Sequence, residues 1–356
     1  MRKQYSESNS SSARGFLWKP LISKVQKCMW WIIFSLLFLI ALLFLAANFP
    51  GLDPREDVRF GVTFSSRFAR DLGLDPHETL QAIFSDIGIQ KVRIPVYWDL
   101  VEKQKGVFDF SDIDWQLEMA RQNGADVILA MGQKVPRWPE CFVPEWAKTS
   151  EDEKNNAALS FLRETVERYR DHSEIVLWQV ENEPFLHFGT CLPIEASVLD
   201  AEIALVRLAD PSRGILTTDS GELSFWIPSA SRGDVFGTTL YRRIWNERFG
   251  YFTYPIGPAF FRMKAALVRL FTDQKHFMII ELQGEPWGPG SFLDMPLSEQ
   301  WKTMNAEKLR EAVFYARQVG FSDVYLWGAE WWYWLKISKG ESALWEEAKA
   351  LLSPNH

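Results

Sequence analysis

The sequence is poor in cysteine and histidine and lacks the common cofactor motifs. Of its 356 residues, only 3 are Cys and 5 are His. No Cys/His spacing resembles a metal site, and three cysteines cannot staple a small secreted fold. The stretch RFGVTFSSRF at 59–68 does not match the glycine fingerprint of dinucleotide-binding proteins, and no phosphate loop is present. We therefore expect neither a metal nor a nucleotide cofactor.

The composition indicates a globular protein with a large core. Hydrophobic residues make up 47% of the chain, which is too many for a disordered protein, and 21 Gly are too few for a collagen. The 17 Trp residues exceed what an ordinary domain carries.

One long segment has no charged residue at all. From Cys28 to Ala47 the chain reads CMWWIIFSLLFLIALLFLAA, and about 20 apolar residues suffice to cross a bilayer as a helix. Six basic residues and one acidic residue precede the segment, so the positive-inside rule predicts a cytoplasmic N-terminus and a body outside the membrane. The alternative is a cleaved signal peptide, against which the long basic leader and Leu45 near the exit argue.

The charge balance of the body argues against nucleic acid as a partner. Without residues 1–47 the chain keeps 33 basic and 45 acidic residues, a net charge of −12, and such a body repels phosphate backbones.

We divide the chain into four parts. They are a basic, disordered cytoplasmic tail (1–27), a transmembrane anchor (28–48) contacting the lipid bilayer, a linker (49–57) and a single domain (58–356).

Eight rounds of a short apolar run followed by an amphipathic stretch fill this domain. The short runs lack a two-residue alternation, as expected for strands buried on both faces of a parallel sheet. Eight rounds in about 300 residues match a (β/α)8 TIM barrel, with a doubly wound open sheet as the competitor. The strands are predicted at 58–64, 90–96, 125–131, 174–180, 213–219, 234–240, 276–282 and 322–328. The helices are predicted at 76–87, 112–123, 153–170, 195–209, 222–230, 258–272, 297–319 and 342–352.

Two carboxylates stand at predicted strand ends. Glu183 closes the fourth strand in WQVENEP, and Glu281 closes the seventh in FMIIELQGEPWG. In a barrel the C-terminal strand ends meet at one mouth, where function gathers. A pair of carboxylates there is what glycosidic bond cleavage uses. The simpler alternative is that each Glu only ends a strand and pairs with Arg93 or Lys134.

These motifs together resemble glycoside hydrolase clan A, the retaining (β/α)8 glycosidases, and within it the cellulase-like family 5. The resemblance covers about residues 58–335 and depends on Asn182-Glu183-Pro184, Glu281, Arg93 in VRIPVYW, Tyr241 and Trp327. The stretch RIPVYWDLVEKQKGVFDFSDID also resembles β-galactosidase-type members of the clan. The third strand departs from family 5 because it ends in Gln133-Lys134, where a histidine is usual.

The resemblance implies a role for each matching residue. Glu183 would be the general acid/base and Glu281 the catalytic nucleophile, while Asn182 would bind the 2-hydroxyl of the sugar. Arg93 and Tyr241 would hold Glu281, since a nearby positive charge favours an ionised carboxylate. Trp327 would form the apolar floor under the sugar ring.

Other residues near the strand ends have weaker assignments. Glu181 and Glu285 are alternatives for the acid and the nucleophile, respectively. Further candidates for substrate contact are Trp98, Gln133, His187, Gln283 and Trp287. Sugar-stacking positions also include Trp138, Trp331, Trp332 and Trp334, whereas Trp115, Trp301 and Trp345 fall at helical positions and are expected to pack.

Cys141 and Cys191 lie in the loops after the third and fourth strands, on one face of the barrel. In an extracytoplasmic domain they could form a disulfide; the alternative is two unpaired thiols.

The sequence therefore predicts a membrane-anchored retaining β-glycosidase that acts on a carbohydrate substrate through a covalent intermediate. Two alternatives stay open at this point. One is a catalytically inactive glycan-binding barrel, and the other is a transglycosylase acting on envelope or exopolysaccharide glycans.

Overall fold

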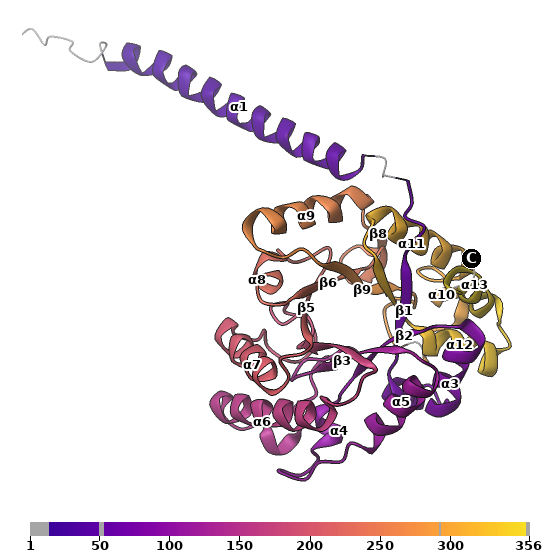
Figure 1. Cartoon of the computed structure of the whole chain (residues 1–356). Coiled ribbons are helices and arrows are strands. Elements are labelled where there is room, and N and C mark those ends of the chain that lie inside the picture. The colour runs from indigo at the N-terminus through magenta and orange to yellow at the C-terminus, as the bar shows by residue number, and fades with distance from the viewer. Residues whose placement is uncertain (1–13, 50–52, 292, 354–356) are drawn as a thin grey trace, which may run out of the picture.

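The computed structural model describes residues 14–49, 53–291 and 293–353. The start of the expected tail, 1–13, and part of the expected linker, 50–52, lie outside the described residues. Eight parallel strands close into a barrel in the order β1-β10-β9-β6-β5-β4-β3-β2, with helices around it (Figure 1). The predicted TIM barrel is confirmed.

Each barrel strand lies within its predicted range, except that β9 continues to Gln283. The strands are β1 (Arg59–Thr63), β2 (Lys91–Pro95), β3 (Asp126–Met131), β4 (Ile175–Val180), β5 (Gly214–Asp219), β6 (Val235–Leu240), β9 (Phe277–Gln283) and β10 (Asp323–Trp327).

Most of the predicted helices are present, and their starts show the expected chemistry. Asp75 caps α3, accepting hydrogen bonds from the backbone N–H groups of His77 and Glu78, with Pro76 in the first turn. The helices that match are α3 (Pro76–Ala82, continued by a π-helical turn at Ile83–Ile87), α5 (Ser111–Gln122), α6 (Glu151–Tyr169), α7 (Ala196–Ala209), α9 (Pro258–Phe271) and α13 (Ala343–Leu352).

Two predicted helices are interrupted. The range 222–230 contains only α8 (Ile227–Ala230), preceded by a turn in which the Trp226 indole donates to Ser220 O at 2.9 Å. The range 297–319 divides into α10 (Leu297–Gln300) and α11 (Ala306–Val319), because Asn305 caps a new helix by accepting from Lys308 N. At Asn305 this local hydrogen bond competes with helix continuation.

Several short elements were not predicted. They are α2 (Ser66–Asp71), α4 (Trp98–Val101), the 3-10 turn Glu145–Ala147, the hairpin of β7 (Arg243–Asn246) and β8 (Gly250–Thr253), and α12 (Ala329–Lys339). The prediction that Trp331, Trp332 and Trp334 stack on sugar was wrong, because these residues belong to α12. All three are buried in the core, because the helix turns them inward behind β10.

An apolar layer fills the lower part of the barrel. Glycines on neighbouring strands make room for its larger members: a Cβ at Gly61 would lie 2.7 Å from the Tyr325 ring, and one at Gly237 would lie 2.9 Å from Ile280. The layer consists of Ile128, Leu216, Met278, Ile280 and Tyr325. It leaves the C-terminal end of the barrel as the place for polar groups.

The N-terminal helix, α1 (Arg14–Ala47), extends away from the barrel beside α9 (Figure 1). The segment 14–27, expected to be disordered, is therefore helical. Among the described residues, Gln26–Ala47 is the one stretch long and apolar enough to cross a membrane. The end of α1 meets the barrel where Asn48 Nδ2 donates to Pro255 O at 3.3 Å.

Candidate active site

Two glutamates lie at the mouth of the barrel. Glu281 is part of β9, and Glu183 follows β4 in a turn where its φ is 44°. Glu183 N donates to Thr218 Oγ1 at 2.9 Å, and Thr239 Oγ1 donates to Glu183 Oε1 at 3.2 Å. Glu183 is only 5% exposed and Glu281 only 3%, so both carboxyls lie in a largely water-excluded site.

Arg93 connects Glu281 on β9 to Asn182, the residue that precedes Glu183. Its Nη1 donates to Glu281 Oε1 and its Nη2 to Asn182 Oδ1, both at 2.7 Å, while Nε donates to Gln179 Oε1 at 2.7 Å. Tyr241 OH donates to the other Glu281 oxygen at 3.3 Å. Each of the three nitrogens of the fully buried guanidinium therefore donates to a neighbouring side chain. The structure brings Arg93, Asn182, Tyr241 and Glu281 together as the sequence predicted.

The environment of Glu183 favours its protonated form. Burial raises the pKa of the Glu183 carboxyl well above its usual range, and the nearby charges of Glu140 and Glu281 add to the rise. Lys134 acts in the opposite direction but does not cancel the effect. A carboxyl of this kind can donate a proton at a pH where an ordinary glutamate is ionised.

The sequence reasoning missed a third carboxyl in the site, Glu140. It is buried, with φ 55°, in the loop after β3. Burial and the charge of Glu281 raise the pKa of Glu140 to about 8. One signal was available: Glu140 directly precedes Cys141, and a disulfide to Cys191 would bring it to the loop of Glu183.

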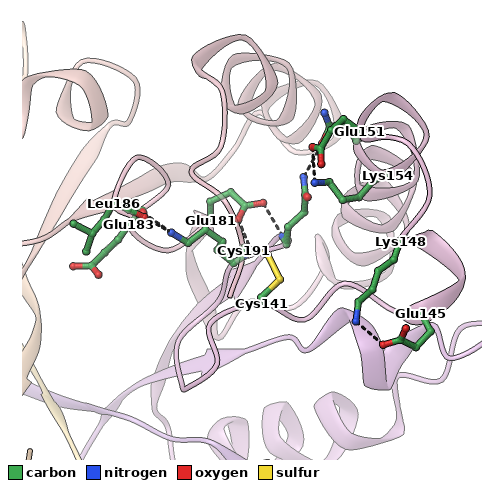
Figure 2. Close-up of a disulfide and its surroundings, with 12 residues drawn as sticks. Cys141, Glu145, Lys148, Glu151, Lys154, Glu181, Glu183, Leu186 and Cys191 are labelled. Carbon is green, nitrogen blue, oxygen red and sulfur yellow. Dashed lines mark hydrogen bonds and ion pairs between the residues drawn. A yellow bond between two sulfur atoms is a disulfide. The ribbon is translucent and has the colours of Figure 1, made fainter. Parts of the chain in front are cut away.

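Glu181 supports the backbone of the site. Its Oε1 accepts from Gln133 N at 2.7 Å and its Oε2 from Lys134 N at 2.6 Å. Lys134 Nζ in turn donates to the carbonyl oxygens of Glu183 at 3.0 Å and Leu186 at 2.8 Å. Figure 2 shows Glu181 and Glu183 in this setting. Glu181 thus ties the loops after β3 and β4 together, and both of its oxygens are used in doing so.

Glu285 belongs to an ion-pair network around Trp327. The Arg137 guanidinium donates to both Glu285 oxygens at 2.7 and 2.8 Å, and to Glu330 at 3.2 Å. The Trp327 indole donates to Glu285 Oε1 at 2.7 Å, and Arg137 covers one Trp327 ring face at 4.2 Å. Trp327 is only 6% exposed. Glu285 is therefore held by Arg137, whereas Glu281 is held by Arg93.

Three predicted contact residues do not face the mouth. Trp98 is fully buried, donates to Glu102 at 2.7 Å and stacks on Phe161. Gln133 is buried and donates to Asn155 on α6 at 3.1 Å. These predictions were wrong because the backbone turns both side chains towards the surrounding helices.

Gln283 is the third of them. Its Oε1 accepts from the backbone N–H groups of Arg242 at 3.0 Å and Arg243 at 2.9 Å, and its Nε2 donates to Arg243 O at 2.6 Å. The amide therefore fixes the start of β7, and its hydrogen bonds are satisfied within the protein.

A row of aromatic rings ends at Tyr241, the residue that donates to Glu281. Ring centroids lie 5.9 Å apart between Trp138 and Phe188, 5.8 Å between Phe188 and Trp287, and 5.3 Å between Trp287 and Tyr241. Trp138 is 69% exposed and Trp287 partly exposed. His187, beside Phe188, is exposed on this rim. The loops after β4 and β9 thus meet through their aromatic side chains.

The disulfide between Cys141 and Cys191 is present, with its sulfur atoms 2.01 Å apart (Figure 2). It joins the loop of Glu140 to the loop that follows Glu183. Thr190 N donates to Pro139 O at 3.0 Å beside it. The two loops therefore form one unit at the rim of the mouth.

Replacing both cysteines, as Cys141→Ala with Cys191→Ala, is expected to destabilise the fold. The sequence separation of 50 residues corresponds to a loss of about 4 kcal/mol in the free energy of unfolding, by the loop-entropy relation. Urea unfolding of the full chain in detergent measures the change. Cys28→Ala, which removes the free cysteine of α1, is the control, and an unchanged midpoint in the double variant would contradict the prediction.

In the described parts of the chain, no group of three or more His, Cys, Asp or Glu side chains could hold a metal ion.

Comparison with known families finds a match that includes part of this site. The cellulase model, glycosyl hydrolase family 5, matches residues 60–226. The matched range contains Arg93, Asn182 and Glu183, while Glu281 lies beyond it.

Individual relatives agree with this match but are distant. A β-galactosidase LacZ from Heyndrickxia coagulans is 27% identical over 124 residues, which is 29% of this chain and 18% of the relative. The chain thus matches less than a fifth of the length of that protein. A GH5_18 structure from Streptomyces cattleya in complex with GlcNAc has a TM-score of 0.55 at 16% identity, covering 77% of this chain and 71% of the other. A β-galactosidase structure from Halorubrum lacusprofundi has a TM-score of 0.52 at 16% identity, covering 76% and 52%. At these identities the structures support the fold.

Proposed function

From the premise that this chain is a (β/α)8 barrel of the glycoside hydrolase clan A type, with its family match in the cellulases of family 5, we propose that it is a retaining β-glycosidase. One observation carries the proposal: Arg93 bonds both Glu281 and the Asn182 that precedes Glu183. A single buried guanidinium thereby links the Glu281 carboxylate to the residue that precedes Glu183.

In the proposed reaction Glu281 attacks the anomeric carbon while Glu183 protonates the leaving oxygen. The attack breaks the glycosidic bond and forms a glycosyl ester on Glu281. Glu183 then removes a proton from water, and the water oxygen displaces Glu281 from the sugar. The raised pKa of Glu183 suits the first proton transfer. Arg93 and Tyr241 hold the Glu281 carboxylate in position for its attack.

The activity test uses the full chain in detergent and a panel of p-nitrophenyl β-glycosides: glucoside, galactoside, mannoside and xyloside. Hydrolysis of at least one, with the β-anomer as the first product, supports a retaining β-glycosidase. Release of the α-anomer, or binding without turnover over long incubation, contradicts it. Product analysis with an added acceptor sugar separates hydrolysis from transglycosylation.

The proposal includes anchoring through α1, with the barrel outside the cytoplasmic membrane. Two features support this location: the uncharged run from Cys28 to Ala47 after a basic leader, and a disulfide, which forms in oxidising compartments.

Anchoring predicts that the expressed full chain stays with the membrane fraction after alkaline carbonate washing. Protease added to spheroplasts should degrade the barrel without cell lysis. A second chain, starting at residue 26, tests the signal-peptide alternative. If the apolar segment were cleaved off as a signal peptide, both the full chain and this shorter chain would leave the membrane. Release by carbonate, or protection of the barrel from protease, would refute anchoring in this orientation.

A further inference from the structure

One helix of the barrel differs from the others in charge. α9 carries Arg262, Lys264 and Arg269 and no acidic residue. Each of the other helices of eight or more residues that the structure describes around the barrel contains at least one Asp or Glu. The chain after residue 47 has 33 basic and 45 acidic residues. α9 is therefore a cationic element on an acidic protein.

The same helix exposes large apolar side chains. Its inner face, with Phe261 and Val268, packs in the core. On the outer side Leu267 is 51% exposed, Leu270 73% and Phe271 66%. Positions three and four apart are neighbours on a helix surface, so these side chains form one stripe. An outer apolar stripe on a helix rich in Lys and Arg is typical of a helix that lies in a membrane interface.

The turn after β5 extends this apolar surface. Lys264 Nζ donates to Gly221 O at 2.6 Å and to Ser224 O at 2.7 Å, which holds the turn against α9. Leu223 and Phe225 in this turn are also exposed. Exposed apolar side chains that gather on adjoining segments mark a contact surface, whereas single ones do not.

This surface adjoins the end of α1. Ala47, the last residue of α1, is buried, and a Cβ at Gly257 directly before α9 would lie 2.8 Å from Ala47 O. Asn48 Nδ2 donates to Pro255 O at 3.3 Å. Figure 1 shows α9 beside this end of α1. If Gln26–Ala47 spans the membrane, the start of α9 is held at the bilayer surface.

The charge of α9 determines which partner fits this surface. Anionic phospholipid headgroups attract Lys and Arg near the bilayer, while apolar side chains enter the boundary below the headgroups. The exposed Lys275 follows the helix and adds to its charge, against one exposed acid, Asp273. A second copy of the chain fits less well, because a symmetric contact would bring the basic residues of two α9 helices together.

We propose that α9 lies on the bilayer that α1 spans, with Leu267, Leu270 and Phe271 inserted at an anionic phospholipid surface. This inference rests on the proposed anchoring through α1 and does not depend on glycosidase activity. α9 leads from the mouth end of the barrel, after β6, back to the start of β9. A barrel docked along this helix therefore lies on its side, and its mouth opens along the membrane surface.

The experiment uses the full chain reconstituted into vesicles of phosphatidylcholine with phosphatidylglycerol. In the Cys28→Ala background, which lacks the free cysteine of α1, Leu270→Cys carries an environment-sensitive fluorophore. Docking should shift its emission to the blue, and phosphatidylcholine brominated on its acyl chains should quench it. Val107→Cys in the same background is the matched control and should show neither effect. Val107 is 60% exposed and precedes α5, which lies across the barrel from α9 (Figure 1).

Two changes should weaken the docked state. Leu267→Ser together with Phe271→Ser, added to the labelled Leu270→Cys chain, should lower the ratio of docked to free label on the order of tenfold or more, because two apolar side chains no longer leave water. Both positions are exposed, so the fold does not depend on them. Vesicles of phosphatidylcholine alone should lower the ratio at least about fivefold, because the basic residues lose their anionic partners. An unchanged ratio in both tests would overturn the proposal.

A label on the native Cys28 of wild type reports by the same quenching whether α1 is inserted. A quenched label at Cys28 with an unquenched label in Leu270→Cys would overturn docking and leave anchoring intact. An unquenched label at Cys28 would refute anchoring, and docking with it. A blue shift in Leu270→Cys without quenching by brominated lipid would show cover by a second copy and would overturn the proposal too. Hydrolysis of p-nitrophenyl β-glycosides by the same vesicles measures the glycosidase function separately.

Discussion

Glu281→Ala is expected to lower kcat on an aryl β-glycoside by on the order of 10⁴- to 10⁶-fold, the range seen when a covalent nucleophile is removed. The loss should be this large because the neighbouring side chains are arranged to hold one carboxylate, that of Glu281. Arg93 Nη1 bonds one of its oxygens at 2.7 Å and Tyr241 OH the other at 3.3 Å.

Added azide separates a lost nucleophile from a damaged fold. In Glu281→Ala the cavity left by the carboxylate admits this small anion beside Arg93, which then attacks from the same face as the missing side chain. The expected product is the α-glycosyl azide, and its appearance is followed by NMR.

Glu285→Ala provides the comparison that decides between the two glutamates of the ELQGEP motif. Glu285 is paired with Arg137 and receives the Trp327 indole, so its loss should destabilise the fold and weaken turnover without azide rescue. Azide rescue in Glu285→Ala and not in Glu281→Ala would reverse the assignment. Full activity in Glu281→Ala would refute it.

Glu183→Gln is expected to affect substrates according to their leaving groups. For an alkyl β-glycoside, whose departing oxygen needs a proton, kcat/KM should fall about 10²- to 10⁴-fold, the usual contribution of a general acid. For a 2,4-dinitrophenyl glycoside, whose leaving group departs unprotonated, the fall should be less than about tenfold. Equal losses on both substrates would contradict the role of Glu183 as the acid.

The pH dependence of kcat/KM gives a second measurement on Glu183. The acid must carry its proton, so activity is present below its pKa and is lost as the pH rises through it. Burial together with the charges of Glu140, Glu281 and Asp219 raises this pKa, and Lys134 opposes the rise. The alkaline limb of wild type should therefore lie above the usual range of a glutamate, and Glu183→Gln should lack it. An alkaline limb that is unchanged in the variant would assign it to another group.

The strands were predictable because burial on both faces leaves a strong signal in the sequence. The run VILAM (127–131) is apolar for five residues, and the run FMII (277–280) is apolar for four and ends at Glu281. Glu183 and Glu281 follow from the same pattern, since parallel strands place their C-terminal ends at one mouth.

What the sequence could not predict is where side chains point once a strand has ended. Gln133 follows Gly132, whose φ of 140° is open only to glycine, and the chain there turns Gln133 towards α6. Trp98 starts α4, which directs it onto Phe161. Glu140 was missed because its place depends on the pairing of Cys141 with a residue 50 positions away. Such directions depend on tertiary contacts that no local pattern contains.

The burial of the tryptophans determines how the protein can be followed by fluorescence. Trp98, Trp178, Trp226, Trp331, Trp332 and Trp345 are less than 2% exposed. Their emission should lie at short wavelength in the folded chain and shift to the red on unfolding, which makes intrinsic fluorescence a sensitive probe of stability. The same interior emission forms a large background for Trp138 and Trp287 at the mouth. A sugar that touches only those two rings will change the spectrum little unless the interior tryptophans are first replaced.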